Sequence, residues 1–432
     1  MDLVFERLIR SFASMQQRDF RFLTFSTATL GFGQWFQQIG LGWLVLELTG
    51  SAAQIGAVAF IQGIMVLVVS VPAGVLADRY SRRDVLVWTT GVGVAQALAL
   101  AVLVVSGQTQ TWHLYAFAFI GGLATGFTQP VRQALVYDLT TPELLTNAMT
   151  VNSLAQNVAR VTGPPMAGAI LGLLGTSSAF FVLAGLKVLA MTSTMLIRSS
   201  AQPRVLLQRE SPFTSLTDGL RYSFRSPGIR ALLVATSVAP VLVYPYIQFL
   251  PVFAKDVLHG GAETYGILAS GVGWGSLLGL GALVYLGDVR RKGTVFLASH
   301  AMYIGMVIAF SRAESLPVSM AFLVLAGVCN SISGVLNNIL FQLVATNEMR
   351  GRVMALHSMS NGLQPMGSLP MGLAMERWGA PNTVSAFMAV AMTVLLSVAV
   401  FFPELRRIGM SPAIAEESQE EVSSGIAGPG SN

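Results

Sequence analysis

The residues that could take part in chemistry are few, and they form no catalytic or metal-binding set. The 432-residue chain has 21 Asp and Glu, 4 His and 1 Cys. Cys329 lies inside an apolar run, which gives neither a disulfide framework nor the spacing of metal ligands. The sequence has no Gly-rich phosphate loop, no His-Glu-x-x-His helix and no nucleophile elbow. We therefore expect no metal, no cofactor and no enzyme activity.

Amides and arginines inside apolar runs are the more informative polar residues. Gln34 and Gln38 are four residues apart, so both lie on one face of a helix. Asn152, Gln156 and Arg160 form a second stripe with the same spacing. A polar group at membrane depth is costly unless it faces protein or water, so these faces should line a shared interior. The alternative is that the amides only join helices, at about 0.6 kcal/mol each.

The composition indicates which elements must carry these residues. Charged residues make up 11 % of the chain and hydrophobic residues 53 %, whereas a soluble domain has about 25 % charged residues. The net charge of +5 does not indicate nucleic acid, because the basic residues flank apolar runs as membrane topology requires. The sequence therefore predicts an all-α protein whose partner is the lipid bilayer.

A helix needs about 20 apolar residues to cross the hydrocarbon core. Twelve runs of that length are present, and they predict spans at residues 21–47, 54–76, 85–106, 113–137, 146–174, 178–197, 229–254, 262–286, 293–311, 317–345, 353–377 and 382–402.

Lys and Arg are segregated between alternate loops. One side of the predicted topology holds most of them, while the other holds Lys255, Arg312 and Arg377. Cytoplasmic loops carry the positive charge. We therefore expect a multi-pass protein of the cytoplasmic (inner) membrane with both termini in the cytoplasm.

The chain divides near its middle at a long polar loop that contains an amphipathic pattern. Its acidic end cannot bury enough apolar surface to order itself. The predicted units are an N-terminal six-helix bundle at 1–200, a cytoplasmic linker with an amphipathic helix at 201–228, a C-terminal six-helix bundle at 229–410 and a disordered tail at 411–432.

The two predicted bundles repeat each other. A shift of about 210 residues aligns small and acidic residues at equal points of the spans, as in Gly50 with Gly260, Gly56 with Gly266 and Asp78 with Asp288. A shift of 210 residues relates polar positions of span one to span seven, and a shift of 205 relates those of span four to span ten. The predicted cavity residues are Gln34, Gln38, Arg132, Gln156, Arg160, Tyr244, Gln248, Asn330 and Asn337.

The loop between spans two and three carries a motif. It reads GVLADRYSRRDVL from Gly74 to Leu86, which resembles the signature loop of the major facilitator superfamily, with Ser81 in place of the second glycine. The resemblance implies two pseudo-symmetric six-helix bundles that rock against each other. It also implies a conformational latch, made of Gly74, Asp78, Arg79, Arg82 and Arg83. The alternative is that these arginines only fix the topology, which would not require Asp78 or Gly74.

A second resemblance covers spans four, five, ten and eleven. Its residues include Pro130, Arg132, Asn147, Arg160 and Pro164. These resemble the export-type branch of the superfamily, which includes the enterobactin exporter and macrolide efflux proteins. The resemblance implies a monomeric exporter of small amphipathic, drug-like or siderophore-like molecules that uses protons in antiport.

The charges within the predicted spans narrow the solute. Arg132, Arg160 and Lys187 are the cations, and no Asp or Glu lies near the middle of any span. We therefore expect neutral or anionic solutes rather than cations. Protons would have to be carried by Glu47 or Asp138, at span ends, or by a histidine, with His300 and His357 as the candidates. An uptake symporter and a non-transporting membrane receptor remain as alternative functions.

Overall fold

The computed structural model describes residues 13–198, 221, 227–287, 289, 291–345 and 349–407, and these residues form helices and connecting turns without a strand. The predicted tail at 411–432 and nearly all of the predicted linker at 201–228 lie outside this part of the chain. Ten predicted spans are single helices: α2 (Arg18–Thr49), α3 (Ala52–Arg79), α4 (Arg82–Val105), α5 (Thr111–Asp138), α6 (Leu145–Leu174), α7 (Thr176–Met195), α11 (Ala262–Leu286), α12 (Lys292–Ser311), α13 (Leu316–Val344) and α16 (Ala380–Phe401).

Span seven is a broken helix rather than the uniform one that its hydropathy predicts. It consists of α9 (Pro227–Val238), the π-helix η2 (Ala239–Val243), the 3₁₀-helix η3 (Tyr244–Phe249), α10 (Leu250–Val252) and the π-helix η4 (Phe253–Val257). Three prolines explain the breaks, because proline lacks an N–H and clashes with the preceding turn. They are Pro240, Pro245 and Pro251. Local 3₁₀ and π turns then pair the freed carbonyl groups.

Span eleven is also divided, into α14 (Arg350–Asn361) and α15 (Gln364–Trp378). Gly362 and Leu363 separate the two helices, and Pro365 follows in the first turn of α15. A residue before proline is disfavoured in helical conformation, which explains a boundary at this point. The short helix α17 (Pro403–Arg407) follows the last span.

The turns of the two halves match at equivalent points. Gly175 ends α6 and begins α7 with φ 83°, and Gly379 ends α15 and begins α16 with φ 74°. Both values lie in the left-handed region that favours glycine. In the signature loop, Ser81 caps α4, because its side chain accepts a hydrogen bond from Asp84 N at 3.4 Å. The serine that replaces the family's glycine therefore has a structural role of its own.

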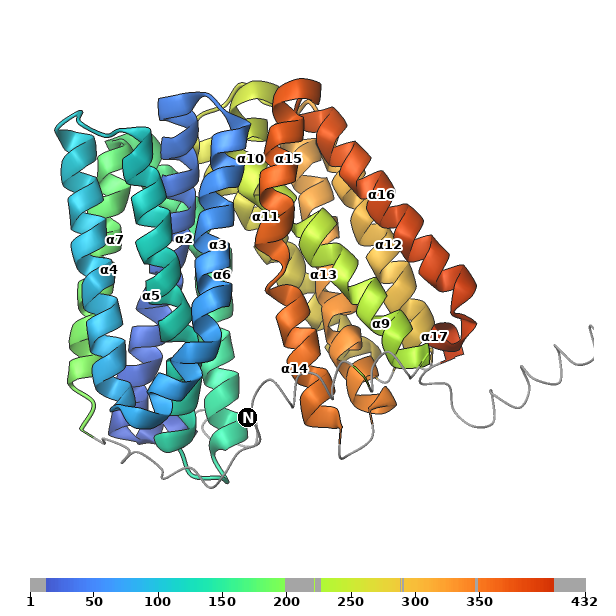
Figure 1. The fold of residues 1–432 in the computed structure, drawn as a ribbon, viewed down its shortest axis with the longest axis horizontal. Helices are drawn as coiled ribbons and strands as arrows, with labels where there is room; N and C mark the ends of the chain where they lie inside the picture. Colours follow the sequence, from blue (N-terminus) through green and yellow to red (C-terminus); the bar gives the residue numbers. More distant parts are fainter. Residues whose placement is uncertain are drawn as a thin grey trace, which may run out of the picture.

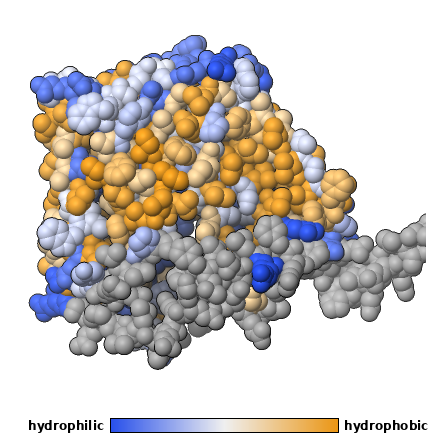
Figure 2. Space-filling model, in the orientation of Figure 1, coloured by the Kyte–Doolittle hydropathy of each residue, from blue (hydrophilic) through white to orange (hydrophobic). Residues whose placement is uncertain are grey.

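The helices form two groups, α2–α7 and α9–α16, as Figure 1 shows. Two helix pairs make the main contacts between the groups: α6 packs against α11, and α3 packs against α15. Smaller contacts join α2 to α10 and α11, and α3 to η3. We call the end of the molecule with Gly50, Gly175 and Gly379 the outer end, and the end with Ser81 and Gly287 the inner end. Figure 2 shows an apolar belt between hydrophilic edges.

Eight helical segments among the described residues are long and apolar enough to cross a membrane. The helices α2, α5, α6 and α15 are not among them, although they have the positions of spans in the bundle. Three of them carry the most polar side chains of the predicted cavity, such as Gln34, Arg132 and Gln156. The lower hydropathy of these helices is therefore explained by polar side chains that face the interior of the bundle rather than lipid. The chain is a multi-pass membrane protein.

Candidate functional site

A cavity of about 710 Å³ lies between the two groups of helices. Its lining comes from α2 to α7 on one side, and from η3, α14 and α15 on the other. Amides dominate its polar surface, with Gln34, Gln37, Gln38, Gln62, Gln129, Gln156, Gln248 and Gln364. Arg132 and Lys187 also line it, and none of the lining residues that the structure describes is acidic. The cavity can therefore hydrogen-bond a polar solute and attract a negative charge.

Five of the nine predicted cavity residues line this space: Gln34, Gln38, Arg132, Gln156 and Gln248. Arg132 comes from α5 and is only 8 % exposed. Its Nε atom has no hydrogen-bond partner among the described residues. Because a buried cation without a partner is costly, this guanidinium is a strong candidate to bind a solute.

The other four predicted cavity residues are not part of the lining. Tyr244 donates a hydrogen bond to Asn330 Oδ1 at 3.1 Å, and Asn337 Oδ1 accepts one from Thr236 at 2.9 Å. These bonds join span seven to α13 within one group of helices. Arg160, on α6 of the other group, interacts electrostatically with Tyr244. The role of these four residues in solute binding stays a prediction.

Several lining residues were not predicted. They are Lys187, Thr90 and four of the eight glutamines, namely Gln37, Gln62, Gln129 and Gln364. Lys187 stood out in the sequence as one of three cations within the spans. It was not predicted in the cavity, because α7 has no stripe of polar residues that would mark it as facing the interior. Gln37 lies between Gln34 and Gln38 in the sequence and also lines the cavity, so the polar face of α2 is wider than the predicted stripe.

Two of the five predicted latch residues have side chains that the structure describes. Arg82 Nη1 lies 2.6 Å from Asp138 Oδ2 and also donates to Ala134 O at 3.1 Å. Arg83 Nη2 donates to Met195 O at 2.5 Å. Both arginines thus bind α4 to neighbouring helices of the same group. The surroundings of Gly74 and the side chains of Asp78 and Arg79 lie outside the described part, so the latch stays a prediction.

The pair of Arg82 and Asp138 predicts a measurable coupling. Its side chains are 18 % and 9 % exposed, so a charge-assisted hydrogen bond here should contribute about 1.5–3 kcal/mol. We expect Arg82→Met and Asp138→Asn each to lower the unfolding midpoint in detergent, and the double variant to lose less than the sum. Arg83→Met is the control, since that arginine binds only a carbonyl group among the described partners. Additive losses would show that the pair is not coupled.

The predicted proton-carrying residues lie at the ends of the spans and in buried positions. Glu47 accepts a hydrogen bond from Thr176 at 2.8 Å near the outer end, and Asp138 is engaged by Arg82 near the inner end. His300 is 4 % exposed, and neither ring nitrogen has a hydrogen-bond partner among the described residues. His357 is 6 % exposed and stacks on Phe341. None of the four lines the cavity.

The two groups are in close contact from the outer end to mid-span. A Cβ atom on Gly56 of α3 would lie 2.5 Å from Ser368 O of α15, and one on Gly168 of α6 would lie 2.7 Å from Gly266 Cα of α11. Small residues allow membrane helices to approach in this way. The outer side of the cavity is therefore closed by backbone packing.

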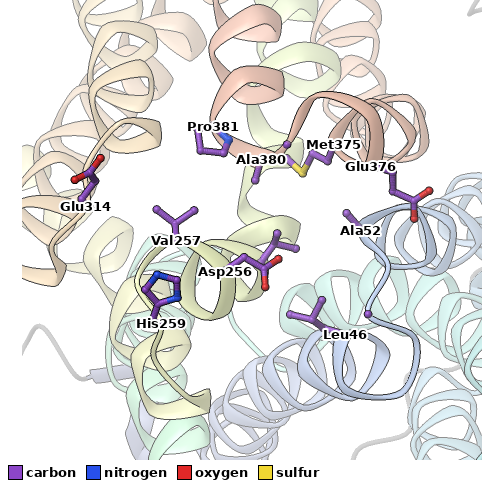
Figure 3. A pocket seen from close by; sticks show the side chains of 13 residues that line it. Leu46, Ala52, Asp256, Val257, His259, Glu314, Met375, Glu376, Ala380 and Pro381 are labelled. Carbon is purple, nitrogen blue, oxygen red and sulfur yellow. The ribbon is translucent and has the colours of Figure 1, made fainter.

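A hydrogen-bonded link covers this closure at the outer surface. The Glu376 carboxylate accepts hydrogen bonds from the Ser51 hydroxyl and from Ala53 N, the latter at 3.3 Å. It lies at the N-terminus of α3, which favours negative charge. Figure 3 shows Glu376 beside Ala52 at the edge of an outer pocket of about 650 Å³, which also has Asp256, His259 and Glu314 in its lining.

Comparison with known proteins identifies the family. The family model described as "Transmembrane secretion effector" matches residues 9–424. The chain belongs to this family. It is a transporter of the major facilitator superfamily, as the signature loop predicted.

Individual relatives cover nearly the whole chain. The Staphyloferrin A transporter of Staphylococcus aureus is 25% identical over 387 residues, which is 88% of this chain and 94% of the relative. The Multidrug efflux pump Tap of Mycolicibacterium fortuitum is 26% identical, covering 90% of this chain and 97% of the pump. The Enterobactin exporter EntS of Salmonella typhimurium is 25% identical, covering 85% and 88%.

Solved structures share the fold of this transporter. A POT family transporter in complex with 5-aminolevulinic acid aligns with a TM-score of 0.71 at 11% identity, over 90% of this chain and 97% of that one. A bacterial homolog of the human lysosomal transporter Spinster, in an inward-facing and unoccupied conformation, aligns with a TM-score of 0.64 at 15% identity, over 90% and 95%. The major facilitator fold predicted from sequence is confirmed.

Proposed function

We propose that this transporter exports small amphipathic molecules, neutral or anionic, from the cytoplasm by alternating access. The observation that carries the proposal is the central cavity, whose described lining has eight glutamines, two cations and no acidic residue. Lipophilic cations are poor ligands for such a surface, because no carboxylate is present to pair with them.

The direction of transport is inferred from the relatives. An exporter of enterobactin and a multidrug efflux pump are both similar along most of their length. Drug-like or siderophore-like amphipathic molecules are therefore the class that we propose for this cavity. With both termini in the cytoplasm, the closed outer end would leave the cavity accessible from the inner side, where a solute for export has to bind.

The mechanism follows from the two groups of helices. The N-terminal bundle, 1–200, and the C-terminal bundle, 229–410, would rock as a monomer about the contacts between α3 and α15 and between α6 and α11. Opening outward would break the link of Glu376 with Ser51 and separate the glycine contacts. The latch at Gly74, Asp78 and Arg79 would then hold the inner side closed.

Protons are the proposed energy source. A proton entering through one of Glu47, Asp138, His300 and His357 would shift the balance between the two conformations. Transport that is unchanged in the alanine variants of all four residues would rule out this part of the proposal.

Vesicles with a defined orientation test the direction and the solute class together. We expect inside-out vesicles with an acidic lumen to accumulate the anionic dye fluorescein. Uptake of its cationic relative rhodamine 6G should be at least about tenfold lower, which corresponds to a difference of about 1.4 kcal/mol in binding free energy. Vesicles without the transporter are the control. Strict selectivity for the cationic dye would contradict the proposal.

The same vesicles distinguish the two alternative functions. An uptake symporter would concentrate solute in right-side-out vesicles with an acidic exterior, and loss of the protein from its host would lower the internal solute. Loss of an exporter should raise it instead. A receptor that keeps the fold would bind solute without any accumulation driven by a gradient. No observation in the cavity favours either alternative over export.

A further inference from the structure

Lys187 is a cation that reaches the cavity from an unexpected helix. It belongs to α7, and its side chain passes Gly93 of α4, where an added Cβ would lie 2.9 Å from Lys187 Nζ. Its ammonium group donates a hydrogen bond to Gln37 Oε1 of α2 at 3.1 Å. Both residues line the central cavity. The glycine at position 93 therefore makes room for a lysine that comes from behind α4.

The hydrogen bonds of this lysine are incomplete. An ammonium group has three donors, and Gln37 is the partner of Lys187 within the described part of the chain. Gln37 accepts through Oε1, which leaves the two N–H donors of its Nε2 available on the same side. Gly121 of α5 leaves space here, since an added Cβ would lie 3.2 Å from Gln37 Nε2. Unused donors on two side chains thus border the same open space.

No described residue in contact with Lys187 carries a negative charge. Its described neighbours are Gln37 on α2 and Gly93 on α4, and both are uncharged. Thr90 on α4 and Gly121 on α5, which line the same cavity, are also uncharged. Gln96 of α4 also approaches Gly121, but its amide nitrogen is bonded to Phe117 O at 2.5 Å. An ammonium group at membrane depth without a carboxylate partner is costly. An anion in the cavity would supply the missing counter-charge.

A second cation lies on the path toward the inner end. Arg132 is on α5, eleven residues beyond Gly121, which places the two about 16 Å apart along the helix axis. Its buried Nε has no partner among the described residues. The positive charge of the cavity is therefore distributed between a deep position, at Lys187, and a position nearer the inner end, at Arg132.

We propose that Lys187 and Gln37 form an anion-anchoring subsite, which binds a carboxylate or a similar oxyanion on the transported solute. Arg132 attracts the same group on its way from the inner end. The inference rests on the proposed function, and it narrows the solute to amphipathic molecules with at least one oxyanion. Lys187 supplies the charge, while Gln37 orients the ammonium group and donates a second hydrogen bond through Nε2.

Binding of three naphthalene probes tests this subsite. The probes are 1-naphthoate, 1-naphthamide and 1-naphthylmethylammonium, which share a ring and differ in charge. The full-length protein in lipid nanodiscs is titrated with each by calorimetry, without any gradient. We expect the wild type to bind naphthoate at least about tenfold more tightly than the amide, as a charge-assisted hydrogen bond implies, and to bind the ammonium probe most weakly.

Variants assign this preference to the subsite. Lys187→Met and Lys187→Gln should bind naphthoate and naphthamide equally, whereas Lys187→Arg should retain part of the preference. Gly93→Val keeps the charge but displaces the ammonium, so it should also lose the preference. Lys255→Met is the matched control, because Lys255 is exposed at the outer end of span seven. Size-exclusion profiles and unfolding midpoints show which variants are folded.

The possible outcomes separate this inference from the proposed function. A wild type without a preference for naphthoate would overturn the subsite, and so would Lys187 variants that keep it. Because binding is measured at equilibrium, neither result depends on the direction of transport or on protons. If the preference depends on Lys187 but vesicles accumulate no solute, the subsite stands and the proposed export fails.

Discussion

Replacing Gly63 by leucine is expected to abolish transport while the protein still folds. Gly63 of α3 packs on the ring of Pro365 in α15, and a Cβ at this position would overlap the ring. A proline ring on a helix cannot rotate away, so the two groups of helices would have to separate. Overpacking of this kind costs typically about 1–3 kcal/mol and more against rigid groups. Each 1.4 kcal/mol changes the population of the closed form about tenfold.

Cross-linking measures this separation directly. In a Cys329→Ser background, Ser51→Cys and Glu376→Cys place thiols on the two sides of the outer link, and a short bis-methanethiosulfonate should join them. Addition of Gly63→Leu should reduce the cross-linked fraction by about tenfold or more, in parallel with transport. Gly281→Leu is the control, since Gly281 has no atom within 4 Å of an added Cβ. Full cross-linking in the Gly63 variant would contradict the prediction.

Replacing Arg132 by methionine should stabilise the protein and at the same time reduce the uptake of anionic solutes. The guanidinium is buried and no hydrogen bond joins it to a described residue, so its desolvation is uncompensated. Replacing buried ions by apolar residues of similar volume is neutral or stabilising by about 1–4 kcal/mol. The cavity would keep its shape but lose the charge nearest the inner end.

Two measurements on purified protein check both halves of this prediction. The unfolding midpoint should rise for Arg132→Met and fall for Arg82→Met, because Arg82 has a carboxylate partner and Arg132 has none among the described residues. Uptake of fluorescein into inside-out vesicles should fall by at least about tenfold for Arg132→Met. A lower midpoint for this variant would show that Arg132 stabilises the fold through interactions of its own.

The spans could be predicted closely from sequence because lipid leaves the backbone few options. Every amide has to be paired within the segment, so an apolar run of about 20 residues forms a helix whatever else it contains. The predicted span at 262–286 and the helix α11 (Ala262–Leu286) coincide for this reason. The breaks in spans seven and eleven were missed, because hydropathy does not register the loss of single hydrogen bonds at Pro245 or Pro365.

The cavity could be predicted only in part, because a sequence marks interior faces only through stripes of polar residues and through the repeat. Gln34, Gln38 and Gln156, which form stripes, lie in the lining. Tyr244 and Asn330, which the repeat indicated, bond to each other outside the lining, and their role in solute binding stays a prediction. Lys187 could not be placed, because its position depends on Gly93 of another helix. A contact between residues so far apart in sequence leaves no periodic pattern.

The contacts between the two groups of helices explain why certain glycines recur in the internal repeat. Gly56 and Gly266, which the repeat aligns, lie at the two equivalent interfaces, α3 with α15 and α6 with α11. Gly63 and Gly273 are related by the same shift, and Gly273 packs on the backbone of Arg160. Duplication therefore preserved the positions at which the backbones have to touch.

The amide-rich lining has a consequence for how many solutes one cavity can accept. Turning the end of a glutamine side chain by half a rotation exchanges its oxygen for its nitrogen, so a donor becomes an acceptor without any movement of the backbone. Eight such side chains surround the cavity. Chemically unlike guests could then each find a matching pattern in the same rigid enclosure. Polyspecificity would arise from adjustable polarity, while the two fixed cations set the one requirement that all guests share.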